Sequence, residues 1–208
     1  WLKLPVGYFR TIFDERFARQ FEVEAQEQTA MRRMIWPRGR ILGGSSSING
    51  LIYIRGQHAD YDNWAQLGAT GWSYKEVLPY FLRSECFDGP PSAYHGTGGE
   101  LGVSELRNKD PSCQAWLDAA QEYGLPFNPD FNGASDYGVG RYQLSIKGRW
   151  RSSAAAAFLR PVERHPNLTL RTGVLVSRVL IEQGRAVGVV CRQGGQEHTL
   201  RCDGDVIL

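Results

Sequence analysis

The sequence has 208 residues, of which 42% are hydrophobic and 22% are charged, and its formal net charge is +2. This composition is that of an ordinary folded protein and argues against intrinsic disorder. Lys and Arg are interleaved with Asp and Glu without a basic stripe, so we expect no nucleic-acid partner. No apolar run approaches the roughly 18 residues that a membrane-spanning helix needs.

The first 35 residues mix aromatic and charged side chains. Phe9, Phe13 and Phe17 are spaced as on one face of a helix, whereas Phe21 and Val23 alternate as in an extended segment. We therefore expect a helix followed by an extended segment in this region.

The stretch from residue 36 to residue 62 concentrates glycine and serine more than any other part of the chain. Adjacent Gly43 and Gly44 allow positive φ and let the backbone approach a ligand without a Cβ in the way. The serines that follow, at positions 45–47, offer hydroxyl and backbone donors to a polar ligand or a helix start. An apolar run over 48–54 comes next, which is not typical of a flexible linker. We predict a shaped ligand-binding loop that leads into buried structure.

Two helices are indicated beyond this loop. Ser73 and Glu76 form a capping box before an apolar helical face, which predicts a helix running to about Ser84. Asp110 is a suitable cap for a second helix, with proline at its first position and an end at Gly124. Between them, residues 87–109 are rich in Gly and Pro, and we expect an ordered loop with short strands there.

The last third of the chain changes to short β-branched runs separated by glycines. A strand is predicted over 141–147 and a third helix over 154–160. The strands of a predicted β-meander are Leu168–Thr172, Val174–Glu182, Ala186–Arg192 and Glu197–Cys202, with one more beginning at Val206. Helices and loops come first and hairpins last, so we predict an α+β fold, a mixed α/β arrangement rather than repeated βαβ units.

Local catalytic signatures are missing from the sequence. There is no GxGxxG fingerprint, GxSxG elbow, HExxH motif or P-loop. We interpret His58, His95, His165 and His198 as structural or surface histidines. The cluster 149–151, Arg-Trp-Arg, is interpreted as a solvated helix entry, with an anion contact as the alternative.

The cysteines are scattered thiols without metal-ligand spacing, at positions 86, 113, 191 and 202. That usage suits a reducing compartment, and a cytoplasmic location is favoured. The sequence begins with Trp1 and stops within a predicted strand, from which we expect an internal fragment of a longer protein.

The glycine-rich stretch resembles the first signature of the glucose–methanol–choline (GMC) family of FAD-dependent oxidoreductases, most closely in its choline dehydrogenase-like branch. The resemblance extends over roughly residues 5–208. Its motifs are Gly39-Arg40-x-Leu42-Gly43-Gly44-Ser45-Ser46-x-Ile48-Asn49, Gly71-Trp72-Ser73-Tyr74, Tyr94-His95-Gly96, Phe131-Asn132-Gly133 and Arg149-Trp150-Arg151-Ser152.

The resemblance implies a partial GMC fold with a cofactor site. Residues 1–58 and 166–208 would be pieces of a discontinuous FAD-binding domain that includes the β-meander, and 59–165 the first part of an α+β substrate-binding domain. The residues expected to contact FAD are Gly43, Gly44, Ser45, Asn49, Gly50 and Val176. Ile48 stands where some relatives carry a histidine that bonds covalently to the flavin, so the resemblance implies noncovalent FAD.

The resemblance also implies the reaction, the oxidation of a small primary alcohol such as choline by hydride transfer to the flavin. The catalytic histidine is expected beyond Leu208, and the electron acceptor and oligomeric state are left open. The 208 residues alone are expected to be inactive. Two alternatives remain, a hydroxynitrile lyase on the same fold and a non-catalytic binding protein that kept the fold. No metal is expected in any of these cases.

Overall fold

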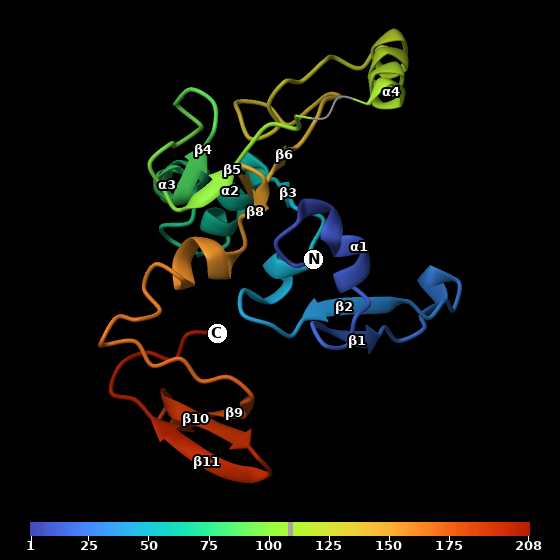
Figure 1. Ribbon diagram of the computed structural model, residues 1–208. Coiled ribbons are helices and arrows are strands. Elements are labelled where there is room, and N and C mark those ends of the chain that lie inside the picture. Colours follow the sequence, from blue (N-terminus) through green and yellow to red (C-terminus); the bar gives the residue numbers. More distant parts are fainter. Residues whose placement is uncertain (108–109) are drawn as a thin grey trace. The chain divides into compact units, whose positions relative to one another are not determined.

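The computed structural model describes residues 1–107 and 110–208, which separate into two compact units, residues 1–162 and 163–208 (Figure 1). The first unit combines helices with four two-stranded sheets, and the second holds one three-stranded sheet. This mixture confirms the predicted α+β class. The predicted loop over 87–109 ends on two residues, 108 and 109, that lie outside the described residues.

The first unit contains most of the elements. Its helical segments, short 3₁₀ and π turns included, are η1 (Pro5–Gly7), α1 (Tyr8–Thr11), η2 (Glu27–Thr29), η3 (Gly44–Ser47), α2 (His58–Gln66), α3 (Tyr74–Ser84), α4 (Pro111–Glu122) and η4 (Ala155–Leu159). Its strands are β1 (Ala18–Glu22), β2 (Ile35–Gly39), β3 (Ile52–Tyr53), β4 (Glu85–Phe87), β5 (Leu101–Val103), β6 (Gln143–Leu144), β7 (Ile146–Lys147) and β8 (Trp150–Arg151). Strands β1 and β2, β3 and β6, and β7 and β8 pair antiparallel, whereas β4 and β5 are parallel.

The helix ends follow the predicted capping chemistry. At the start of α3, Glu76 accepts a hydrogen bond from the backbone N–H of Ser73 at 3.1 Å, which confirms the capping box. At the start of α4, Asp110 accepts from the backbone N–H of Ser112 at 2.9 Å. Gly124, with φ of +104°, follows the end of α4. The third predicted helix, 154–160, is shorter than expected and forms the five-residue π turn η4.

The predicted helical face near the N-terminus is wrong. Helix α1 ends at Thr11, and Phe9 and Phe13 are each 67% exposed, so no apolar face is buried there. The carbonyl of Asp14 accepts hydrogen bonds from the N–H groups of Phe17 and Ala18, forming the turn that leads into β1. The extended segment that was predicted next is β1 itself.

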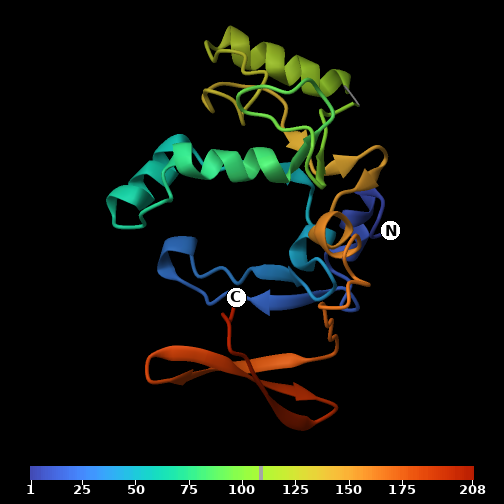
Figure 2. The same ribbon diagram turned by 90° about the vertical axis from the view of Figure 1, so that its left-hand side faces the viewer.

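The second unit is the predicted β-meander. Strands β9 (Leu175–Glu182), β10 (Arg185–Gln193) and β11 (Gln196–Arg201) pair antiparallel in the order β11-β10-β9, as Figures 1 and 2 show. The predicted strands at 168–172 and from Val206 do not form, because within the described residues they have no neighbouring strand to complete a ladder.

The strand predicted over 141–147 is interrupted. It divides into β6 and β7 at Ser145, whose N–H donates to the carbonyl of Leu51 at 2.7 Å. The strands on either side of Ser145 have different partners: β6 pairs with β3, and β7 pairs with β8. This change of partner connects the segment after the glycine-rich loop with β8.

Polar side chains occupy much of the interior of the first unit. Glu85 is fully buried and His95 is 5% exposed. The imidazole lies between two carboxylates, with Nδ1 3.1 Å from Glu85 and Nε2 3.0 Å from Asp130. Arg55 donates to the same Glu85 at 3.1 Å. With His95 protonated, the four groups are balanced in charge, two positive and two negative.

This buried network sets the register of β3. The side chain of Asn132 accepts from the N–H of Arg55 at 2.8 Å and donates to the carbonyl of Tyr53 at 3.1 Å. It also donates to Gln143 in β6. Since β3 follows the glycine-rich loop directly, the network holds the strand at which that loop ends.

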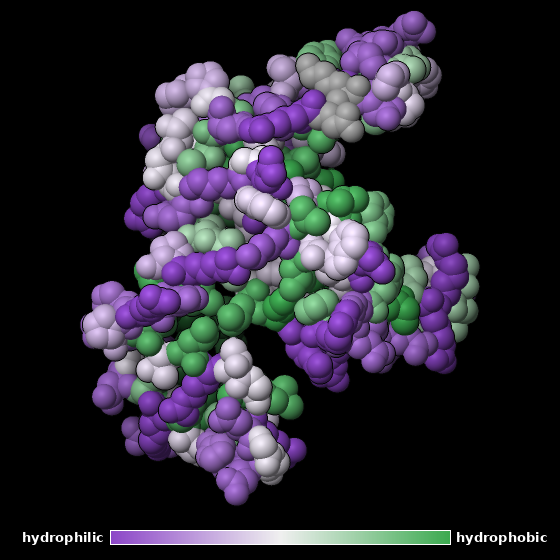
Figure 3. Space-filling view, viewed as in Figure 1, coloured by the Kyte–Doolittle hydropathy of each residue, from purple (hydrophilic) through white to green (hydrophobic). Residues whose placement is uncertain are grey.

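Apolar side chains also reach the surface. Figure 3 shows hydrophobic residues among hydrophilic ones on the displayed face, and Trp1 and Trp116 are more than 60% exposed. No helix among residues 1–107 and 110–208 is long and apolar enough to cross a membrane. Exposed apolar surface of this extent is typical of contact with other polypeptide or with a ligand.

The buried network predicts how stability depends on pH. Burial opposes the charged imidazole, but hydrogen bonds to Asp130 and Glu85 outweigh it and raise the pKa of His95 to about 9. Because this pKa is raised in the folded state, the protonated His95 contributes its full stabilisation of the fold below the ordinary pKa of about 6.5. That contribution is lost as the pH rises through about 9. We expect the free energy of unfolding, measured with urea, to fall over this window, and His95→Gln to flatten that fall.

His198→Gln, at an exposed position in β11, is the matched control and should keep the fall. The same pH dependence in His95→Gln and in the unsubstituted protein would contradict a charged role for His95.

Candidate cofactor site

The glycine-rich loop between β2 and β3 is folded back on itself. Gly43, with φ of +88°, precedes η3, which is one turn of 3₁₀ helix, and Gly44 has φ of +53°. The N–H of Gly44 donates to the carbonyl of Ile41 at 2.8 Å, and the N–H groups of Ile48 and Asn49 both donate to the carbonyl of Ser45. The two left-handed glycines let the chain reverse direction here without a Cβ clash.

The serine hydroxyls stabilise this turn. Ser46 donates to the carbonyl of Gly43 and accepts from the N–H of Ala154, and Ser47 donates to the carbonyl of Leu42 at 2.8 Å. Of the two roles expected for the serines, these two hydroxyls therefore take the one at a helix start and not the one toward a ligand. Ser45 differs, because its hydroxyl oxygen accepts from the N–H of Gly39 at 3.1 Å and its own proton remains available to a ligand.

Arg151 holds the loop from the β8 side. Its Nη1 donates to Oδ1 of Asn49 at 2.7 Å and to the carbonyl of Ser46 at 3.2 Å. The same Oδ1 of Asn49 accepts from the N–H of Leu51, a non-glycine residue with φ of +71°. Arg151 is only 6% exposed, so the interpretation of this arginine as part of a solvated helix entry is wrong. Sequence carried no local signal for the contact, because its partners lie more than 100 positions away.

An open groove of about 400 Å³ lies along the loop. Three of the predicted cofactor residues, Ser45, Asn49 and Gly50, line it together with Ile48. The rest of the groove comes from Ile12, which directly follows α1, and from the β2 residues Ile35, Trp36, Pro37 and Arg38. The groove therefore combines apolar and aromatic walls with a few polar groups, the pattern of a small-molecule or cofactor site.

The other three predicted residues have different surroundings. Gly43 and Gly44 shape the turn that carries Ser45 and do not line the groove. Val176 lies in β9 of the second unit, opposite Cys191, with its side chain half exposed. The structure thus brings Ser45, Asn49 and Gly50 together.

The groove leaves room for a cofactor at Gly50. A Cβ added to Gly50 would meet only the ring of Tyr8, at 4.0 Å, so the backbone is open to close approach. Ile48 is 2% exposed and aliphatic, and it has no atom that could bond covalently to a flavin. A planar, largely apolar ring with polar edges, such as a flavin, suits these walls and donors.

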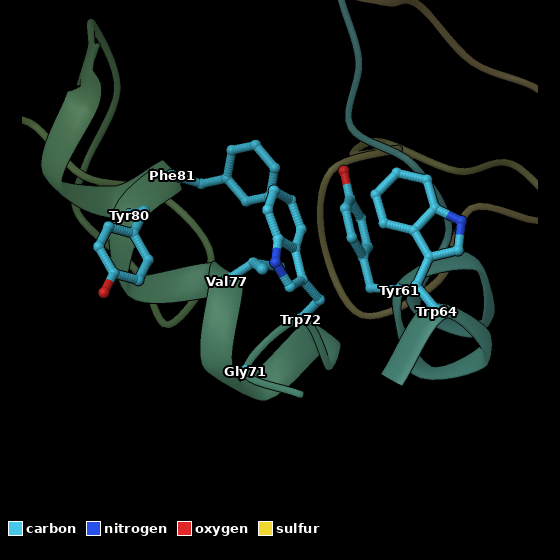
Figure 4. A pocket seen from close by; sticks show the side chains of 7 residues that line it. All are labelled: Tyr61, Trp64, Gly71, Trp72, Val77, Tyr80 and Phe81. Atoms are coloured by element: carbon cyan, nitrogen blue, oxygen red, sulfur yellow. The ribbon is translucent and has the colours of Figure 1, made fainter. Parts of the chain in front are cut away.

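A second pocket in the first unit is aromatic and shares no lining residue with the groove. Figure 4 shows Phe81 from α3 and Trp72 on the side toward Tyr61 and Trp64 from α2. Gly71, Val77 and Tyr80 complete the lining. Its volume is about 580 Å³. No predicted cofactor residue lines it.

Comparison with known proteins assigns the family. The model of the GMC oxidoreductase family matches residues 23–208. The chain belongs to the GMC oxidoreductase family. It is 37% identical over 210 residues to an oxygen-dependent choline dehydrogenase of Photobacterium profundum, with all of this chain and 37% of that protein covered. The chain thus spans about a third of the length of this curated relative.

Solved structures of GMC oxidoreductases show the same fold. Pyridoxine 4-oxidase from Mesorbium loti matches with a TM-score of 0.90 at 28% identity, over 97% of this chain and 40% of that one. An FAD-dependent oxidoreductase from Chaetomium thermophilum matches with a TM-score of 0.85 at 28% identity, over 97% of this chain and 37% of that one. The fold expected from the resemblance is confirmed, as part of a larger GMC architecture. FAD is the cofactor of this family, and the matched N-terminal domain is its FAD-binding part.

The two loop glycines of this GMC oxidoreductase should respond differently to substitution. A Cβ at Gly43 would lie 2.6 Å from Oγ of Ser47 and 3.0 Å from the backbone N of Ala155, whereas a Cβ at Gly44 would meet nothing within 4 Å. Gly44→Ala therefore incurs only the left-handed backbone cost of about 1 kcal/mol. Gly43→Ala adds a clash, and we expect about 2–4 kcal/mol in total by urea unfolding. Equal losses would contradict the packing of the loop against η4.

Proposed function

We propose that this chain carries the flavin-binding loop of an FAD-dependent enzyme that oxidises a small primary alcohol, with choline or a choline-like alcohol as the substrate class. The observation that carries the proposal is the groove lined by Ser45, Asn49 and Gly50 in a GMC oxidoreductase. The similarity to a protein named oxygen-dependent choline dehydrogenase supports an alcohol of this kind.

The chain's own residues bind and orient in this proposal. When bound, FAD supplies the redox chemistry by taking up the hydride of the alcohol carbon. Ser45 offers a hydroxyl proton to the cofactor, Gly50 allows the backbone to approach it, and Arg151 keeps Asn49 in place. Because Ile48 offers no nucleophile, the cofactor is held noncovalently. The base that accepts the alcohol proton is a residue of the full-length protein outside these 208 residues.

The proposal divides the chain by role. Residues 1–58 and 166–208 belong to the FAD-binding domain, with Val176 toward the adenine, and residues 59–165 begin the substrate-binding domain. Since these residues supply only part of the cofactor contacts, the isolated 208-residue chain binds FAD weakly and is inactive. The activity belongs to the full-length protein.

Anaerobic reduction tests the reaction. We expect the FAD-loaded full-length protein to lose the visible absorbance of its oxidised flavin when choline is added without oxygen. A tertiary alcohol, which has no hydrogen on its carbinol carbon, is the matched control and should leave the spectrum unchanged. No bleaching by any primary alcohol, together with cleavage of a cyanohydrin, would replace the proposal with a lyase.

Substitution of Gly50 tests the groove. Gly50 lines the groove, and a Cβ there would meet only the Tyr8 ring, at an ordinary contact distance of 4.0 Å, so we expect Gly50→Leu to keep the fold while its larger side chain displaces FAD. We expect the FAD dissociation constant of the full-length protein to rise about tenfold or more, measured by flavin fluorescence, because a steric clash of this size costs at least about 1.4 kcal/mol. Gly98→Leu, at another exposed glycine with open space around it, is the control. Unchanged affinity in Gly50→Leu would place FAD elsewhere.

A further inference from the structure

Arg151 is a buried cation without a counter-charge among the described residues. Only 6% of it is exposed, and no Asp or Glu of residues 1–107 and 110–208 forms a salt bridge with it. Burial alone lowers the pKa of its guanidinium, with no opposing contribution from a carboxylate. A buried charge of this kind is costly unless a partner of opposite sign compensates for it.

The hydrogen bonds of Arg151 leave part of the guanidinium unused. Both bonds to the glycine-rich loop come from Nη1, and the buried Nε has no partner in the described part of the chain. The planar guanidinium carries five N–H donors in a fork that matches the oxygens of a phosphate or carboxylate. Arg151 can therefore serve the loop and an anion at the same time.

The cavity beside Arg151 is basic. It has a volume of about 570 Å³ and is separate in its lining from the cofactor groove. Lys3 and Arg160 line it together with Arg151, and no Asp or Glu is among its lining residues. The remaining walls are apolar or neutral, formed among others by Leu42, Trp150 and Ala156. Three positive charges and no negative one around a cavity favour an anion with more than one negative charge.

We propose that this cavity is an anion site and that its ligand is a phosphate-type dianion held by Arg151, Lys3 and Arg160. The inference concerns a cavity other than the cofactor groove and does not depend on the proposed oxidation of an alcohol. Two sources share this chemistry, a free phosphate or diphosphate and the diphosphate of a bound dinucleotide.

Titration of the full-length protein with inorganic diphosphate tests the site. We expect binding by calorimetry to the FAD-free protein. If FAD loading abolishes it, the cofactor's own diphosphate occupies the cavity, and if binding persists, the site takes a free anion. Both outcomes support the site and distinguish the two sources.

Substitutions assign the binding to this cavity. Arg151→Met should weaken diphosphate binding about tenfold or more, because it removes a charge-assisted contact. Arg149→Met, the exposed neighbour two positions away, removes the same charge and should bind as before. Because Arg151→Met also removes the bonds to the loop, Lys3→Met and Arg160→Met serve as independent variants, each with an expected weakening of roughly threefold.

Two results would overturn the proposal. One is no diphosphate binding to the FAD-free protein, which would mean that the guanidinium is compensated by another group. The other is equal weakening in Arg149→Met and in the three cavity variants, which would reduce the effect to general surface charge.

Discussion

The hydrogen bonds between Arg151 and the loop around Asn49 are the constraint on which the candidate site depends. They join residues about 100 positions apart, and they hold the loop within η3, at Ser46, and just after it, at Asn49. Without them, local contacts alone would have to offset the conformational entropy that the glycine-rich segment loses when it becomes ordered. The serine hydroxyls supply those local contacts, and Arg151 connects the turn to the rest of the unit.

The first unit is specified by polar contacts as much as by apolar burial. Glu85 and Gln143 are among its most deeply buried side chains, beside Val103 and Ile48. A buried network in which each member is satisfied restricts the geometry more than apolar packing does, since a shifted register would leave donors and acceptors unpaired. Asn132 shows this directly, because its amide joins β3, β6 and the backbone of Arg55. The two-residue strands of this unit are too short to define their pairing by themselves.

His95 and Arg151 show how the surroundings of a residue determine its role. His95 was interpreted as structural on general grounds, and it lies buried between two carboxylates that keep it charged. Arg151 was interpreted as solvated, yet it is buried and bonded to the loop. Both belong to short motifs in which the sequence resembles the GMC family, but local sequence does not reveal the partners 10 to 105 residues away.

The sequence by itself determined the family, the α+β class, the capped helices α3 and α4, the β-meander and the loop that holds the site. These features rest on local chemistry, namely capping residues, glycines at positive φ and alternating β-branched runs, which act over a few residues. Tertiary structure alone decided where the short strands pair, why residues 141–147 divide between two partners, and which serine remains available to a ligand. It also decided that Arg151 faces the loop and a basic cavity, because a buried charge finds its partners through the fold and not through its neighbours in the chain.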